Sequence, residues 1–233
     1  MIIEGLRVAD ERADRGRWPY TVPAVAGLIG EGLRLEAPVT FLVGENGSGK
    51  STIVEAIAEA WGVDVRGGHS GRKYSSELAR SPLGEILVLD RGAEGVAMVR
   101  TKAKGFFLRS ETAFDVFERL GYGPGYTEVS HGESFLQTFE ERFGGRGLYI
   151  LDEPEAALSF TACLSLIAKL AEVVEAGGQV ICATHSPILT AMHGASIVEL
   201  DADGLRPSAW AELELVQHWR RFLDAPERYL RHL

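Results

Sequence analysis

The sequence is poor in several features that mark special classes of protein. Only two of its 233 residues are cysteines, Cys163 and Cys182, and both lie in apolar runs. We therefore expect buried, reduced thiols rather than disulfides or a cysteine metal site. No apolar run reaches the roughly 18 residues that a membrane-spanning helix requires, and no signal peptide is recognisable. These absences predict a cytoplasmic protein without a transmembrane segment.

The chain also lacks an excess of basic residues. It has 24 Lys and Arg against 33 Asp and Glu, a net charge of −9 and a pI near 5.2. This balance argues against a broadly basic surface for nucleic acid, although a local patch within residues 66–73 or 102–109 remains open. Hydrophobic residues make up 45% of the chain, which is enough for the core of one large domain.

What the sequence does contain is a phosphate-binding loop. The stretch is Gly44, Glu45, Asn46, Gly47, Ser48, Gly49, Lys50, Ser51, Thr52. It fits the pattern of glycine, four residues, glycine, lysine, then serine or threonine. Residues 39–43 before it are predicted to form a buried strand, and residues 53–61 after it a helix. Because both flanks are correct, a chance glycine-rich turn is the weaker interpretation.

Each residue type in this loop has a chemical role. Glycines allow successive backbone N–H groups to point inward and form an anion-binding nest, to which the following helix adds the positive end of its dipole. Lys50 supplies a charge for the β- and γ-phosphates, and Ser51 offers a hydroxyl to Mg²⁺. The loop therefore predicts a nucleoside triphosphate bound with Mg²⁺.

Polar residues follow two further apolar strands, predicted at 147–151 and 180–183. Asp152 can hold Mg²⁺ through its water shell, and Glu153 can orient and deprotonate an attacking water. His185 lies where open α/β sheets bind ligands and is expected to donate to the γ-phosphate. The weaker alternatives are that Asp152 and Glu153 belong to a plain acidic turn and that His185 is a core or capping histidine, because a phosphate loop is present.

A weaker signal lies at residues 130–134. Ser130 is predicted to cap a helix that carries Phe135, Phe139 and Phe143 on one stripe, and such a helix start suits an anion. The stretch does not fit a hydrolase nucleophile elbow, because neither serine has glycine both two residues before and two after.

Other elements are expected from periodicity and turn residues. We expect strands at 2–8, 86–89, 96–100 and 105–108, a hairpin at 197–206, a helix at 156–175 capped by Ser159, and two terminal helices packed on the body. Trp18 and Tyr20 are candidates to stack on adenine, although capping of a sheet edge explains them equally well.

These motifs, in this order, resemble those of the ATP-binding cassette (ABC) ATPases. Residues 44–52 correspond to Walker A, and residues 148–153 to Walker B with its glutamate. Residues 130–134 stand at the signature motif and His185 at the switch histidine. The resemblance implies one α/β domain over residues 1–233, with a mostly parallel central sheet, an antiparallel β subdomain and a helical signature lobe at about 105–145.

The details are similar to the RecF/SMC-type and related AAA-type stand-alone ATPases more than to transporter subunits. The signature reads Ser-His-Gly-Glu-Ser rather than Leu-Ser-Gly-Gly-Gln, and Arg109, Ser110 and Glu111 occupy the region of the Q-loop glutamine. The segment between Lys50 and Ser130 is short and has no sustained heptads, which predicts a compact ATPase without coiled-coil arms.

The resemblance implies Mg²⁺-dependent hydrolysis of ATP by two chains paired head to tail. Each ATP would contact Lys50 and Asp152 of one chain and Ser130 and Gly132 of the other, with Lys50, Glu153 and His185 in catalytic roles. Such a dimer would be a nucleotide-gated switch, in DNA maintenance or defence, with DNA or a protein as partner. The alternatives are a transporter subunit, a non-enzymatic ATP-dependent interaction module, and a nucleotide or small-molecule kinase.

Overall fold

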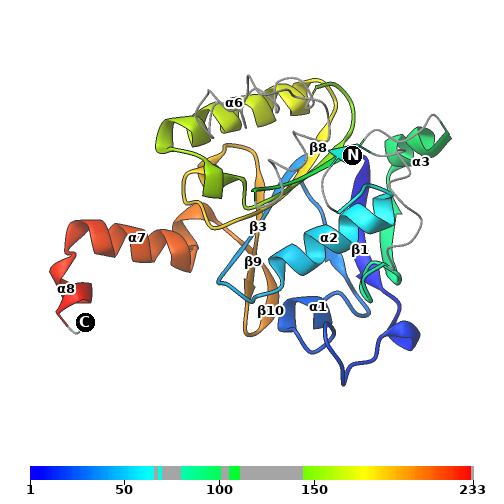
Figure 1. Ribbon diagram of the computed structural model, residues 1–233, viewed down its shortest axis with the longest axis horizontal. Helices are drawn as coiled ribbons and strands as arrows, with labels where there is room; N and C mark the ends of the chain where they lie inside the picture. The colour runs from blue at the N-terminus through cyan, green and yellow to red at the C-terminus, as the bar shows by residue number, and fades with distance from the viewer. Residues whose placement is uncertain (66–67, 70–79, 101–104, 111–143, 232–233) are drawn as a thin grey trace, which may run out of the picture.

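A mostly parallel sheet of seven strands forms the centre of the protein, in the order β10-β9-β3-β8-β7-β6-β4 (Figure 1). The computed structural model describes residues 1–65, 68–69, 80–100, 105–110 and 144–231. The strands are β3 (Val39–Gly44), β4 (Gly68–His69), β6 (Gly105–Arg109), β7 (Leu148–Asp152), β8 (Gln179–Thr184), β9 (Ser196–Asp201) and β10 (Gly204–Ser208). The five inner strands are parallel, and β10 and β4 are antiparallel edges.

A second, antiparallel sheet packs beside the first. It has the order β2-β1-β5, from β1 (Ile3–Val8), β2 (Leu33–Arg34) and β5 (Leu87–Arg91). The buried side chain of Gln179, at the start of β8, joins the two sheets. Its Oε1 accepts from the amides of Ile2 and Ile3, and its Nε2 donates to the Ile3 carbonyl, all at 2.8 Å. Each buried polar group at this junction is thereby paired.

Two long helices cover opposite faces of the central sheet (Figure 1). Helix α2 (Lys50–Trp61) lies between the two sheets and buries Ile53, Val54 and Ile57 in the first core. Helix α6 (Phe160–Glu175) covers the other face and buries Leu166 and Leu170 in the second core. The apolar strands between them are buried on both sides, as expected for a parallel sheet.

The remaining elements are short. They are η1 (Asp10–Arg12), α1 (Pro23–Ala26), α3 (Ala93–Arg100), η4 (Pro154–Ala157), η5 (Leu189–Ala191), η6 (Trp210–Glu212), α7 (Glu214–Asp224) and α8 (Glu227–Leu230). Among the described residues, no helix has both the length and the apolar character needed to cross a membrane. Cys163 and Cys182 are buried free thiols, as the sequence predicts, and burial raises the pKa of both.

The structure confirms the predicted fold class and corrects the strand predicted at 96–100. That segment belongs to helix α3, in which Gly95 and Met98 are buried; Gly92, just before the helix, continues this spacing of three. Gly95 approaches β1 so closely that an added Cβ would lie 2.0 Å from the Ile2 carbonyl oxygen. A glycine in mid-helix lowers helix propensity, so the sequence alone favoured a turn here.

The prediction that the terminal helices pack on the body holds only for the start of α7. Leu213 and Val216 are buried, whereas no residue of α8 is. Beyond its first turn, α7 extends away from the sheets together with α8 (Figure 1). Trp219, Leu223 and Leu230 are exposed along this extension.

Candidate functional site

The phosphate-binding loop connects the buried strand β3 to α2, as the sequence predicts. Gly47 and Gly49 have φ values of 85° and 98°, which glycine adopts without steric cost. Gly44 needs to be glycine for another reason, since an added Cβ would lie 2.4 Å from the Leu200 carbonyl oxygen. The loop is therefore held tightly against β9.

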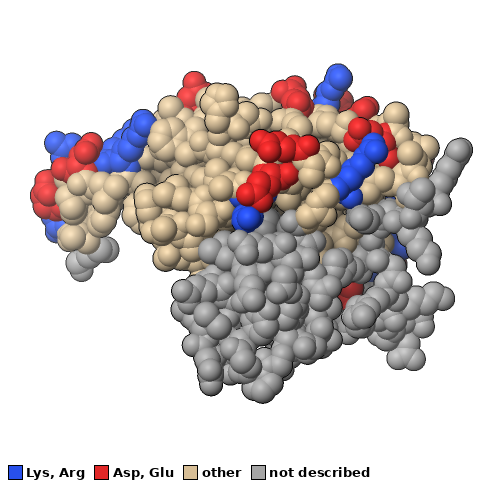
Figure 2. Space-filling model, turned by 90° about the horizontal axis from the view of Figure 1, so that it is seen from above, with Lys and Arg blue, Asp and Glu red and all other residues tan. Residues whose placement is uncertain are grey.

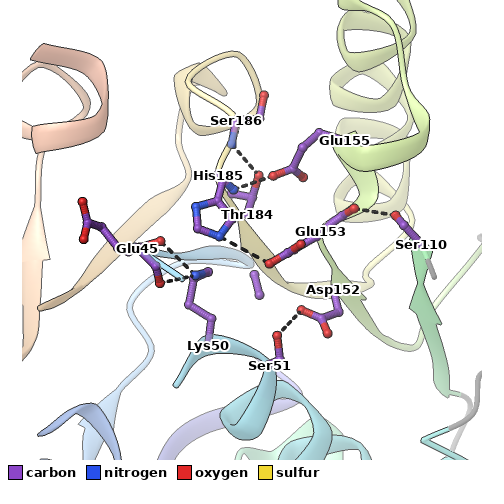
Figure 3. Close-up of polar contacts among 12 residues, drawn as sticks. Glu45, Lys50, Ser51, Ser110, Asp152, Glu153, Glu155, Thr184, His185 and Ser186 are labelled. Atoms are coloured by element: carbon purple, nitrogen blue, oxygen red, sulfur yellow. Dashed lines mark hydrogen bonds and ion pairs between the residues drawn. The ribbon is translucent and has the colours of Figure 1, made fainter. Parts of the chain in front are cut away.

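Lys50 is folded back over this loop. Its side chain is almost fully buried, and Nζ donates to the carbonyl oxygens of Gly44 at 2.8 Å and Glu45 at 2.9 Å (Figure 3). Burial lowers the pKa of Lys50, and the nearby carboxylates of Glu153 and Asp152 oppose that change. A phosphate in the loop would give this ammonium group an anionic partner.

Asp152 ends strand β7 directly opposite the first turn of α2. Ser51 Oγ donates to its Oδ1 at 3.1 Å, and only 1% of the residue is exposed. Burial raises the pKa of Asp152 to about 6, although Arg109 and Ser51 act in the other direction. A buried carboxylate beside a hydroxyl, with too little positive charge around it, fits a site for Mg²⁺.

The metal would need further ligands from outside the protein. Among the described residues, no group of three or more His, Cys, Asp or Glu converges to hold an ion. Mg²⁺ commonly binds through one or two protein oxygens, with water and substrate phosphates completing its coordination. Ser51 and Asp152 are the two protein oxygens that the geometry offers.

Glu153 is held in an unusual backbone conformation. Its φ of 49° lies in the left-handed region, and no other described non-glycine residue has a positive φ. Its N–H donates to the Ala183 carbonyl at 2.9 Å, and its own carbonyl accepts a hydrogen bond from Ser110 Oγ. Strain of this kind persists only where the surroundings impose it, and it is common at functional sites.

His185 faces Glu153 from the end of β8. Its Nε2 lies 3.3 Å from Glu153 Oε1 (Figure 3). Its backbone N–H donates to Glu155, a buried carboxylate whose pKa is raised by burial. Glu155 was missed as a functional residue in the sequence, where it is simply the third acidic residue of the turn at 152–155. The structure shows that it fixes the backbone of His185.

Arg109 and Ser110, at the end of β6, also belong to the site. Arg109 stands in register with Asp152, and its Nε lies 3.2 Å from Oδ2 of that carboxylate. Its guanidinium also bonds Glu55 of α2 at 2.5 Å. The sequence pointed to this segment as the place of a missing glutamine and as part of a possible basic patch, and it gave no sign of the pairing.

Comparison with known proteins gives two sequence matches. Residues 30–100, which include the phosphate-binding loop and α2, match a family described as an AAA domain. The chain is also 26% identical over 195 residues to a Rhizobium etli protein named for ATP binding in ribose, galactose and methyl galactoside import. The match covers 70% of this chain but only 36% of the relative, so the chain spans about a third of its length.

These two matches support an ABC-type ATPase. Solved structures similar to the chain include an SMC head domain from Thermotoga maritima, with 17% identity, a TM-score of 0.49 and coverage of 90% of this chain and 99% of that one. Another is cbiO1 from Clostridium perfringens, part of the ABC transporter complex cbiONQ. It has 16% identity, a TM-score of 0.44 and coverage of 88% and 91%.

Two other predictions from the sequence have different outcomes. Ser130, Gly132 and the remaining signature segment lie outside the described residues, as does most of the expected helical lobe. Tyr20 is buried, and its hydroxyl donates to the Pro82 carbonyl at 2.8 Å, so it is part of the core rather than a platform for adenine. Trp18 is 63% exposed and does not line the cavity beside the loop.

Proposed function

We propose that the chain is an ABC-type ATPase that binds ATP with Mg²⁺, hydrolyses it, and acts in the cytoplasm as a nucleotide-gated switch. The observation that carries the proposal is the convergence of Lys50, Ser51, Asp152, Glu153 and His185. They come from three neighbouring strand ends and face one another across the loop (Figure 3). An anion nest, a metal-binding carboxylate and a candidate base are the parts that phosphoryl transfer to water requires.

In the proposed reaction, water attacks the γ-phosphorus while the bond to the β-γ bridging oxygen breaks. The loop amides and Lys50 hold the phosphates and stabilise charge on them. Glu153 orients the water and accepts its proton, and the strained backbone at this residue fixes where the carboxylate points. His185 contacts Glu153 and is placed to donate to the γ-phosphate. When bound at Ser51 and Asp152, Mg²⁺ supplies charge neutralisation.

We further propose that two chains pair head to tail and share two ATP molecules. In this arrangement Ser130 and Gly132 of the second chain complete each site. The first two turns of α6, which follow the turn at 152–157, carry Phe160 and Leu164 with 66% and 47% of their surface exposed. Such side chains suit contact with another protein, which supports the proposal.

The motif details favour the RecF/SMC-like branch, with DNA or a protein as the partner of the switch. On the face that carries α6, the Lys and Arg of the described residues form no continuous field (Figure 2). This distribution favours a protein partner or a local DNA contact over extensive binding to bare duplex.

The Glu153→Gln variant tests the proposal. We expect its rate of ATP hydrolysis to fall by on the order of 10²-fold or more, because a neutral amide does not accept the proton from water. ATP binding should persist. The variant should form dimers with ATP and Mg²⁺, measured by sedimentation, and the wild-type rate per chain should rise with protein concentration.

Glu172→Gln is the matched control, because Glu172 is an exposed carboxylate of α6 that pairs with Lys169. Its hydrolysis rate should equal that of the wild type. Hydrolysis that survives Glu153→Gln would refute the catalytic assignment. A variant that binds ATP yet stays monomeric would refute the shared-site dimer.

A transporter subunit is the second candidate, and the similarity to the import protein of Rhizobium etli favours it. Arg109 and Ser110 at the Q-loop position argue against coupling to a membrane domain in the usual way. Stimulation of the ATPase by DNA would support the first candidate. Stimulation only by a membrane protein expressed with the chain would support the second.

A further inference from the structure

Arg109, at the end of β6, is a cation placed against the carboxylate of the proposed Mg²⁺ site. Its Nε lies 3.2 Å from Asp152 Oδ2, and its Nη1 lies 2.5 Å from Glu55 Oε1. We infer that Arg109 occupies this pair of carboxylates in place of a metal ion, so that free Mg²⁺ binds poorly and enters only together with a nucleotide. The inference rests on the proposed function and deepens it, because it names the residue that sets the metal preference of the site.

The fold brings these three charged side chains together from three elements. Arg109 and Asp152 are register partners in the parallel strands β6 and β7, so their side chains emerge on the same side of the sheet. Glu55 follows Ser51 by four residues in α2, and both therefore lie on the helix face that meets these strand ends. The backbones of α2, β6 and β7 thus place one guanidinium between two carboxylates.

Burial increases the effect of this charge. The side chain of Asp152 is 2% exposed, and those of Arg109 and Glu55 are 28% and 30% exposed. Water and salt screen such charges less than they screen a surface pair. A second cation that approaches Asp152 therefore meets the repulsion of Arg109 at short range.

A guanidinium cannot itself bind a metal ion. It has N–H donors and no acceptor, and it stays protonated in proteins. A side-chain oxygen at position 109 would add a metal ligand, whereas Arg109 adds only positive charge. Arg109 engages Asp152 Oδ2, and Ser51 Oγ donates to Asp152 Oδ1 at 3.1 Å (Figure 3). Both oxygens of Asp152 are thus already paired within the protein.

A bound triphosphate would change the balance of charge beside Asp152. Its phosphates bring several negative charges, and they supply the oxygen ligands that Mg²⁺ commonly takes from a substrate. Their attraction for Mg²⁺ exceeds the repulsion by a single guanidinium, so the metal and the nucleotide enter together. Such a site stays free of metal until ATP arrives, which makes the complete site depend on the nucleotide.

Arg109→Met tests this inference through the binding of Mn²⁺ alone, measured by electron paramagnetic resonance of the free ion. Mn²⁺ prefers the same oxygen ligands as Mg²⁺. Met keeps a long unbranched side chain but removes the charge, which leaves Asp152 and Glu55 as a vacant pair of carboxylates. We expect the variant to bind Mn²⁺ about 10-fold or more tightly than the wild type. A protein that is merely destabilised would lose affinity instead of gaining it.

Two further variants show whether the gain arises from charge and at Asp152. Arg109→Lys keeps the positive charge and should bind Mn²⁺ within about threefold of the wild type. Arg109→Met combined with Asp152→Asn should lose the gained affinity, because an amide is a poor ligand for the ion. If Arg109→Met does not fold, Arg109→Gln takes its place, since it is neutral but keeps N–H donors for both carboxylates.

Arg7→Met is the matched control. Arg7 pairs with Asp90 at 3.1 Å, so this variant also removes an arginine from a carboxylate, at a half-exposed position on the second sheet. Its affinity for Mn²⁺ should equal that of the wild type.

The outcomes distinguish the inference from the function on which it rests. Unchanged Mn²⁺ affinity in Arg109→Met, with a wild type that binds Mn-ATP, would overturn the inference while the proposed ATPase stands. An equal gain in Arg109→Lys would also overturn it, because charge would then not be the cause. A wild type that does not bind ATP with or without Mn²⁺ would overturn the proposed function, and the inference with it. A gain confined to the neutral variants and abolished by Asp152→Asn would establish that Arg109 reserves the site for the metal–nucleotide complex.

Discussion

Two buried carboxylates lie on opposite sides of the phosphate-binding loop, and each is paired with an arginine. Asp152 of β7 has a side chain that is 2% exposed and lies 3.2 Å from Arg109. Glu199 of β9 has a side chain that is 8% exposed and lies 2.6 Å from Arg206. The two pairs have the same chemistry, yet their other contacts differ.

The difference lies in how fully each carboxylate is satisfied. Besides Arg206, Glu199 accepts from the Ser208 hydroxyl and from the first amide of α7. It therefore fastens the hairpin to the terminal helix. Asp152 accepts from Ser51 and Arg109, and burial still raises its pKa to about 6. A carboxylate that remains short of positive charge is suited to receive a metal ion rather than to hold the fold together.

The largest effect should come from Asp152→Asn. We expect Mg-dependent hydrolysis of ATP to fall by on the order of 10²-fold or more, because an amide is a poor ligand for Mg²⁺. The nucleotide-free protein should lose little stability at pH 8, since the variant removes a buried charge. Steady-state rates at saturating Mg-ATP and thermal unfolding measure the two effects.

The pH dependence of stability sharpens this prediction. The pKa of Asp152 is raised in the folded protein from 3.8 to about 6. The protonated carboxyl of Asp152 therefore stabilises the folded state fully below about pH 4, and this stabilisation is lost as the pH rises through about 6. Over this range the wild type should lose on the order of 2–3 kcal/mol that Asp152→Asn does not lose. Parallel pH profiles for the two proteins would contradict the raised pKa.

Glu199→Ala should have the next largest effect, on folding rather than on chemistry. The substitution leaves Arg206, Ser208 and the Glu214 amide without their shared acceptor. It should lower the free energy of unfolding by about 2–3 kcal/mol. Chemical denaturation measures the change. Glu172→Ala, which removes an exposed carboxylate, should cost less than about 0.5 kcal/mol. Equal costs for the two would show that Glu199 is not a structural anchor.

The sequence predicts a residue of the regions around Asp152 and Glu199 only where its neighbours in the sequence indicate its role. The loop, Asp152 and Glu153 follow apolar strands directly, so pattern and spacing locate them. The roles of Arg109 and Glu199 depend on which strands become neighbours and in what register. A single sequence does not contain that information, because any strand-end arginine looks like a solvated charge. Helix α3 was not predicted, because the glycine at position 95 is required by its close contact with the Ile2 carbonyl of β1 and not by the local helix.

Arg109→Met tests whether the cation beside Asp152 matters to the folded state. It leaves Asp152 and Glu55 close together without their shared guanidinium. We expect a loss of about 1–2 kcal/mol in unfolding free energy at pH 8 and a smaller loss at pH 5, where Asp152 is protonated. Arg7→Met is the control, since Arg7 and Asp90 form a half-exposed pair. It should cost at most about 0.5 kcal/mol at either pH. A pH-independent cost in Arg109→Met would mean that Arg109 acts by packing alone.

The smallest loss of stability should come from removing the cap of α6. This cap is local, whereas the cap of α7 comes from another element. Ser159 is an ordinary local cap, with Oγ accepting from the Ala162 amide at 3.2 Å at an exposed position. Ser159→Ala should cost about 1 kcal/mol. Ser165→Ala, an exposed serine in the middle of α6, should change stability by less than about 0.5 kcal/mol. The cap of α7 comes instead from buried Glu199 on another element, so its loss also detaches the hairpin. If Ser159→Ala lowered the free energy of unfolding as much as Glu199→Ala does, Glu199 would act only as the cap of α7. It would then not anchor the hairpin, and it would differ from Asp152 only in how deeply it is buried.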